Sequence, residues 1–145
     1  MKGAPDSEPD DAQAIIPGPG GVWDIGVIDQ LAAKALAVSA GPIRLLNGYQ
    51  GRTGGWGRQH LIQVRERVRA IEALGYPSCD AFVFDVAANW TVAKAAAEAG
   101  RLKLVKPTAS HELAIVVQWT GRIWSVTTAL PYRPDGKAAL YVKTV

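Results

Sequence analysis

The hydrophobic residues of this 145-residue chain change their spacing at Gly100, and this change limits the possible folds more than any other feature. Before Gly100 the apolar positions recur every three or four residues, as on one face of an α-helix. After Gly100 they alternate, as in half-buried β-strands. Helices followed by consecutive strands are typical of the α+β class. We therefore predict N-terminal helices packed on a four-stranded antiparallel sheet, a meander in which each strand pairs with the next.

The boundaries of these elements follow from capping residues, glycines and the apolar periods. The predicted helices cover residues 28–40, 58–74, 79–88 and 92–99. The predicted strands of the meander cover residues 101–106, 112–119, 122–130 and 138–144, and residues 43–46 could form a further short strand.

Alternation within these strands separates an apolar sheet face from a polar one. The polar face is expected to carry the side chains of Arg101, Lys103, Gln118, Ser125 and Thr127, with Tyr141 and Lys143 as further candidates. Polar side chains also cover many sheets that simply face solvent. The alternation by itself therefore does not assign a function.

Charge is distributed unevenly along the chain. Six acidic residues and one lysine give residues 1–30 a net charge of −5, whereas 15 basic and seven acidic residues give residues 31–145 a net charge of +8. A basic body suits an anionic partner such as nucleic acid, although ordinary solubilising charge is an alternative. The proline, glycine and aspartate content predicts a disordered acidic tail at residues 1–21 and one domain at residues 22–145.

Several function classes lack their characteristic sequence features. Cys79 is the single cysteine, so neither a disulfide framework nor a cysteine-based zinc site is expected. No run of about 20 apolar residues could span a membrane, and the first thirty residues do not resemble a signal peptide. P-loop, GxSxG and HExxH motifs are also missing. We therefore expect no cofactor, no metal ion and no membrane partner.

Two features of the sequence could carry chemistry. His60 follows a glycine-rich loop in Gly-Trp-Gly-Arg-Gln-His-Leu and lies in the first turn of a predicted helix, a position that lowers the pKa of histidine. The second feature is the series of hydroxyls at Ser125, Thr127 and Thr128 on a predicted strand. Each has a purely structural explanation when it is taken alone. A functional site requires that the histidine, the hydroxyls and basic side chains converge.

The order of these motifs resembles the barnase–EndoU–colicin–RelE-like nuclease domains of phage and mobile-element polyvalent proteins and of bacterial toxins. The resemblance spans about residues 42–131, from Pro-Ile-Arg-Leu through the His60 motif to Arg-Leu-Lys-Leu-Val-Lys and Trp-Ser-Val-Thr-Thr-Ala. It implies helices on a four-stranded sheet and metal-independent cleavage of RNA. The chain departs from the family at Arg65, where many members have a second histidine, and at Leu130, near a frequent tyrosine position.

The resemblance implies a mechanism in which the 2′-OH of RNA attacks the adjacent phosphate. His60 would act as base or acid, Thr127 would position the phosphate, and basic side chains would stabilise the developing charge. The predicted catalytic residues are His60, Thr127, Lys103 and Arg44. The predicted substrate-binding residues are Arg58, Arg65, Ser125, Thr128 and Tyr132.

The resemblance also implies partners and a location. The substrate would be RNA, with tRNA as a candidate, and a cognate immunity protein or antitoxin would bind the domain. The domain would act in the cytoplasm, or in the cytoplasm of a target cell after delivery within a larger protein. Two alternatives stay open. One is a catalytically inactive RNA- or protein-binding module on the same fold, which Arg65 favours, and the other is an enzyme of another class, such as a transferase that uses NAD.

Overall fold

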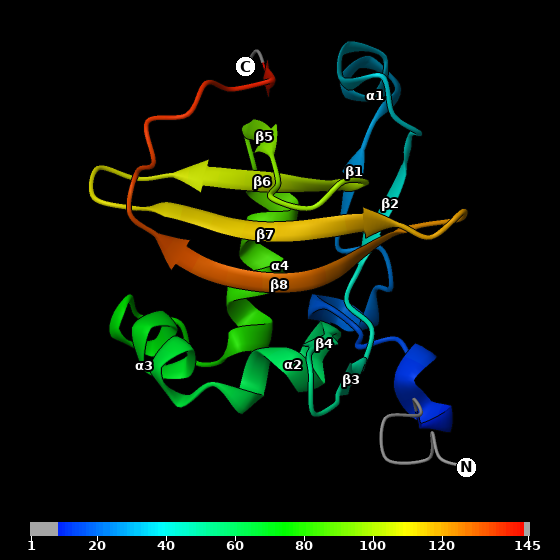
Figure 1. The fold of residues 1–145 in the computed structure, drawn as a ribbon, viewed down its shortest axis with the longest axis vertical. Coiled ribbons are helices and arrows are strands. Elements are labelled where there is room, and N and C mark those ends of the chain that lie inside the picture. The colour runs from blue at the N-terminus through cyan, green and yellow to red at the C-terminus, as the bar shows by residue number, and fades with distance from the viewer. Residues whose placement is uncertain (1–8, 144–145) are drawn as a thin grey trace.

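The computed structural model describes residues 9–143, which form an α+β fold (Figure 1). The α-helices in this part of the chain are α1 (Gln30–Leu36), α2 (Gly57–Gln63), α3 (Arg65–Ala73) and α4 (Cys79–Asn89). The strands are β1 (Gly26–Ile28), β2 (Gly41–Arg44), β3 (Tyr49–Gln50), β4 (Gly55–Trp56), β5 (Val92–Ala95), β6 (Arg101–Pro107), β7 (Glu112–Trp119), β8 (Trp124–Tyr132) and β9 (Tyr141–Val142).

The main sheet is a curled mixed sheet of seven strands in the order β1-β2-β8-β7-β6-β5-β9, so the predicted four-stranded meander is wrong. Strands β6, β7 and β8 do form three consecutive antiparallel strands, as expected. The sheet is larger because β2 pairs in parallel with β8, and β5 lies between β6 and β9. Strands β3 and β4 form a separate hairpin.

Strand β5 replaces the helix that was predicted for residues 92–99. Alanine-rich segments favour helices, but this preference is weak and tertiary packing overrides it. Here Ala93 is fully buried, and β5 is paired along both edges, with β6 and with β9. The small alanine side chain lets the strand pack closely against the core.

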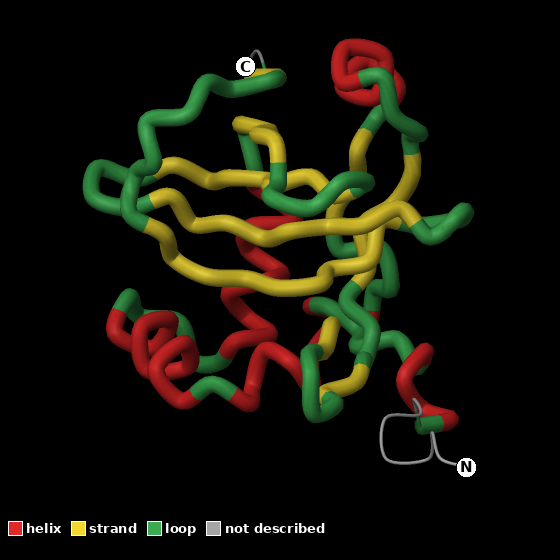
Figure 2. The backbone as a smooth tube through the Cα atoms, in the orientation of Figure 1, coloured by secondary structure: helices red, strands yellow, loops and turns green. Residues whose placement is uncertain are grey.

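Helix α4 covers one face of the sheet, behind β6, β7 and β8 in the view of Figure 2. The hydroxyl of Ser78 caps this helix by accepting from the Ala81 amide at 3.1 Å. Its apolar stripe, which includes Phe82 and Val86, is fully buried against sheet residues such as Ile115. This packing forms the hydrophobic core and leaves the opposite sheet face available for polar side chains.

The predicted helix 58–74 is divided into α2 and α3 at Val64, whose φ and ψ of −96° and 108° are extended. Both helices lie below the β8 edge in Figure 1, and both contact β8. The break matters for function, because residues before and after Val64 do not continue one helical face.

The described part of the predicted N-terminal tail, residues 9–21, lies along the domain. It contains 3₁₀ turns at Asp10–Gln13 and Pro19–Gly21, and Ala12 is buried. The amides of Asn47 and Gly48 donate to the carbonyls of Ala14 and Ala12. Residues 1–8 of that prediction lie outside the described residues. Within residues 9–143 no helix has the length and apolar character needed to cross a membrane.

Candidate functional site

The sheet face opposite α4 carries a band of polar residues, which we call the polar face. Arg101 of β6 pairs with Gln118 of β7, which pairs with Ser125 of β8. Lys103 lies two residues beyond Arg101 on the same side of β6. Thr127 is also on this face, where it lines a pocket with Ser125. The positions of Arg101, Lys103, Gln118, Ser125 and Thr127 on the polar face are confirmed. The further candidates Tyr141 and Lys143 lie on the other face, where Tyr141 packs against the core and Lys143 contacts the buried Trp90 ring.

A β-bulge at Thr127 changes the phase of β8. Val126 pairs with Val117 and Thr128 pairs with Val116, so Thr127 has no opposite residue on β7. The buried core positions of β8 are therefore Trp124, Val126 and Ala129. As a consequence Thr128 shares the polar face with Val116, and Thr127 and Thr128 are no longer alternatives.

A pocket of about 390 Å³ opens between the polar face and the β3–β4 hairpin. Tyr49 and Trp56 of the hairpin line one side. The sheet contributes Arg101, Gln118, Ser125 and Thr127. A pocket with aromatic and hydrogen-bonding walls has the size and chemistry of a site for a small polar group or one nucleotide.

Two hydroxyls of this pocket differ in what they can still bind. The Ser125 side chain is only 4% exposed, and its Oγ has no hydrogen-bond partner within the described structure. The Thr127 hydroxyl donates to the Val116 carbonyl at 3.1 Å. Ser125 can therefore donate to a ligand, whereas the Thr127 oxygen can only accept.

His60 lies in α2, and its Nδ1 is 2.7 Å from Oε1 of Gln50 in the hairpin. The Gln50 amide nitrogen donates to the Gly51 carbonyl at 3.0 Å, which fixes the orientation of the amide and leaves Oε1 as an acceptor. Nδ1 therefore carries the proton of the neutral ring, and Nε2 keeps its lone pair. Burial lowers the pKa of His60, and the positive charges of Arg67 and Arg101 lower it further.

Arg67 of α3 is a site residue that the sequence analysis missed. Its Nη1 donates to the His60 carbonyl at 3.0 Å, and its Nε is buried without a hydrogen-bond partner in the described residues. Burial lowers the pKa of Arg67, which the phenol of Tyr132 partly opposes. No local signal in the sequence pointed to this residue, because the break at Val64 separates it from the helix that carries His60.

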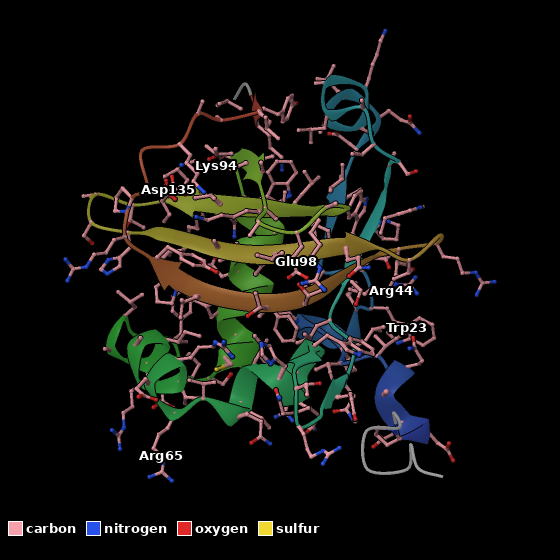
Figure 3. The ribbon with its side chains drawn as sticks, in the orientation of Figure 1. Trp23, Arg44, Arg65, Lys94, Glu98 and Asp135 are labelled. Atoms are coloured by element: carbon pink, nitrogen blue, oxygen red, sulfur yellow. The ribbon has the colours of Figure 1, made fainter. Side chains whose placement is uncertain are left out.

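Three predicted basic residues lie apart from the pocket lining. The Nε atoms of Arg44 and Arg58 bond to carboxylates, Arg44 to Asp24 at 2.6 Å and Arg58 to Asp80 at 2.9 Å. Figure 3 shows Arg65 directed away from the sheet, and its side chain is exposed. The sequence could not show the Arg44 and Arg58 pairings, because each joins residues 20 or more positions apart along the chain.

Lys103 belongs to a second group of charges on the polar face, which we call the lysine–carboxylate cluster. It contains Lys94, Lys103, Glu112 and Asp135, and each lysine lies within 3.2 Å of both carboxylates. Nζ of Lys103 also lies 4.2 Å from the centre of the Tyr132 ring. Lys103 and Tyr132 are therefore close together, as a shared site requires, but the charge of Lys103 is neutralised within the cluster.

Histidine, cysteine and acidic side chains are the usual protein ligands of metal ions. Within residues 9–143, histidine, cysteine and acidic side chains form no group of three that could hold a metal ion.

No protein-family model matches the chain, and no match was found among the curated proteins or the solved structures. The resemblance to the barnase–EndoU–colicin–RelE-like nucleases therefore stays a prediction. Any function has to be argued from the site itself.

Proposed function

We propose that this protein is a metal-independent ribonuclease and that RNA binds along the polar face. The observation that carries the proposal is the state of His60. Its neutral ring has an unprotonated Nε2, its pKa is lowered, and the Arg67 and Arg101 guanidinium groups act on it. Such a ring can exchange protons near pH 7 beside cations that attract phosphate.

The reaction needs few protein groups, because the nucleophile belongs to the substrate. Nε2 of His60 would take the proton from the 2′-OH as this oxygen attacks phosphorus. The bond from phosphorus to the 5′ oxygen then breaks, and this oxygen takes its proton from solvent, which leaves a 2′,3′-cyclic phosphate and a 5′-OH. The protonated His60 returns its proton to solvent. Arg101 and Arg67 would stabilise the negative charge of the transition state.

This assignment revises the predicted roles of several residues. Arg101 and Arg67 take the place of Lys103 and Arg44, because Arg101 lines the pocket and Arg67 contacts the His60 carbonyl. Arg101 also pairs with the exposed Glu98 at 2.6 Å, so a bound phosphate would compete with this carboxylate. Ser125 would donate a hydrogen bond to the phosphate. Thr127 would accept one from a sugar hydroxyl or a base, because its own proton is bound to Val116.

A catalytically inactive RNA- or protein-binding module is the second candidate. The observation that favours it is the position five residues after His60, where Arg65 is exposed and directed away from the sheet (Figure 3). Arg65 therefore does not supply a second acid–base group. A binding module would hold RNA in the same pocket without cleaving it.

The test is cleavage of total tRNA and of a short RNA by the purified protein in EDTA, with His60→Ala as the key variant. We expect products with 2′,3′-cyclic phosphate ends and a rate for His60→Ala that is lower by about 10²–10⁴-fold. His111→Ala, in the β6–β7 turn, removes the other histidine and should cleave at the wild-type rate.

Because the pKa of His60 is lowered from 6.5, kcat/KM should rise with pH below 6.5 and be level near pH 7.

Each other result would select another function. Equal rates for wild type and His60→Ala would exclude His60 as the acid–base group. Binding of RNA without cleavage would favour the inactive module, and consumption of NAD would favour the transferase. For a toxin that acts in the cytoplasm, cells expressing the chain should grow only with an immunity protein or with His60→Ala.

A further inference from the structure

The lysine–carboxylate cluster contains two lysines that the sheet itself holds in place. Lys94 of β5 and Lys103 of β6 are directly paired across adjacent strands, so their side chains leave the same face. The two residues are only 7% and 8% exposed. Lysine is rarely buried to this extent without an anion beside it.

The two carboxylates of the cluster have different origins. Glu112 is a buried residue of β7, and its two oxygens lie 2.6 Å from Lys94 and 3.2 Å from Lys103. Asp135 belongs to residues 133–140, all of which are exposed and form neither helix nor strand. This segment passes the ends of β6 and β7 on its way to β9 (Figure 1), and Asp135 reaches Lys94 beside it (Figure 3).

Asp135 binds both lysines in the way that a bound anion would. Its Oδ1 lies 2.8 Å from Nζ of Lys94 and its Oδ2 lies 3.2 Å from Nζ of Lys103. Hydrogen bonds from Lys94 and from the Lys137 amide lower the pKa of Asp135. Without Asp135 the two ammonium groups would face Glu112 alone, which leaves one positive charge unbalanced in a site nine-tenths buried. The site then requires another anion.

We propose that Lys94 and Lys103 form a phosphate-binding site on the polar face and that Asp135 closes this site by occupying it in place of phosphate. The site lies on the same strand face as Arg101, whose position is two residues or about 7 Å along β6. An RNA strand bound at the pocket would reach it with a neighbouring phosphate. This identification of the ligand rests on the proposed function, but the existence of the anion site does not.

The first experiment measures inorganic phosphate binding at low salt by calorimetry. Asp135→Asn removes the charge but keeps an oxygen for the Lys137 amide. We expect this variant to bind phosphate about tenfold more tightly than the wild type. The reason is that phosphate no longer has to displace the Asp135 carboxylate from its charged hydrogen bonds with the two lysines. Lys94→Gln combined with Asp135→Asn should abolish the gain. Glu66→Gln, which removes one exposed negative charge from α3, should bind like the wild type.

The second measurement uses the wild type, so it does not depend on the folding of any variant. Saturating phosphate should displace Asp135 and raise the hydrogen-exchange rate of the Lys137 amide, which donates to Asp135 at 2.9 Å. An unchanged exchange rate would overturn the proposal. The proposal would also be overturned if Asp135→Asn bound phosphate no more tightly than Glu66→Gln. It would likewise be overturned if the tighter binding of Asp135→Asn persisted when Lys94→Gln is added.

A third measurement separates this inference from the proposed ribonuclease. A 2′-O-methyl RNA cannot be cleaved, and its affinity for Asp135→Asn should fall with salt more steeply, by about 0.7 in the logarithmic slope for one added phosphate contact. If Asp135→Asn binds phosphate more tightly but its RNA affinity shows no steeper salt dependence, the anion site is supported and RNA is contradicted as its ligand. If Asp135→Asn binds phosphate more tightly but the protein does not cleave RNA, only the proposed function is contradicted.

Discussion

Two buried polar atoms of the candidate site lack a hydrogen bond in the described residues, one in the pocket wall and one in a side chain that contacts the His60 carbonyl. Within residues 9–143, Oγ of Ser125 and Nε of Arg67 are both fully shielded and without a partner. A polar atom left in this state destabilises a folded protein by about 1–3 kcal/mol. A binding site can carry such a cost, because the ligand supplies the missing partner.

Ser125→Ala should therefore separate stability from binding. We expect the free energy of unfolding in urea to rise by about 1 kcal/mol, because the unpaired hydroxyl is removed. Binding of a 2′-O-methyl RNA should weaken at the same time. Ser78→Ala is the matched substitution, because Ser78 caps α4 and its loss should lower stability by about 1 kcal/mol. Equal stability losses in the two variants would contradict an unpaired Ser125.

At the scale of elements, the position of the β3–β4 hairpin decides whether the pocket and the His60 partner exist. Gly48 precedes the hairpin with a φ of +72°, and a Cβ at this position would lie 2.0 Å from the Trp56 carbonyl oxygen. The backbone of Gly57 approaches Gly48 in the same place. Only glycine permits this contact, which sets Gln50 beside His60.

Gly48→Ala should displace the hairpin. Gly75→Ala serves as the control, because Gly75 has a φ of +97° but a Cβ there meets no atom within 4 Å. Gly75→Ala should lower the free energy of unfolding by about 1 kcal/mol through backbone strain alone. Gly48→Ala should lower it by roughly 1–3 kcal/mol more, through the clash. Urea unfolding of both variants measures the difference, and equal losses would show that the close approach is unimportant.

Across the whole molecule, ion pairs between distant segments join the layers of the fold. Asp85 of α4 accepts from Lys106 of β6 at 2.8 Å and from the hydroxyl of Tyr76. Burial raises the pKa of Asp85, but the hydrogen bonds from Lys106 and Tyr76 outweigh this effect and lower the pKa below 3.8. This carboxylate therefore ties the helical layer to the sheet only while it is ionised.

Stability should accordingly depend on pH through Asp85. The unfolded chain binds a proton near pH 3.8 and the folded chain binds it at lower pH, so the contribution is complete above about pH 5 and is lost on acidification. Asp85→Asn should be less stable by about 1–2 kcal/mol at pH 7. The difference from the wild type should shrink below pH 4 in urea unfolding. A difference that stays constant down to pH 2 would contradict this role.

Much of the central sheet could be predicted from the sequence. Strands β6, β7 and β8 have strong alternation, and α4 has a serine cap and an apolar stripe, so local residues specify each of them. Strand β5 could not be predicted, because its alanines favour helix and only its two neighbouring strands hold it extended. The parallel pairing of β2 with β8 joins segments about 80 residues apart, and no local pattern encodes it.

The candidate site was predicted in part for the same reason. The face that carries Ser125 and Thr127 follows from alternation, and the helix that carries His60 follows from its apolar stripe. Arg67 was missed because it contributes through its contact with the His60 carbonyl, beyond the break at Val64. Arg44 and Arg58 were overrated, because their carboxylate partners lie 20 and 22 residues away along the chain.

The sequence by itself determined which residues alternate, where α4 begins and ends, and which side chains share one face of β6 and β7. These properties depend on neighbours within a few positions, where backbone geometry is nearly fixed. Only the tertiary structure decided which strands are adjacent and which charges are neutralised. Asp135, for example, meets Lys94 across 41 positions of sequence, and this contact forms only when the chain folds around its core.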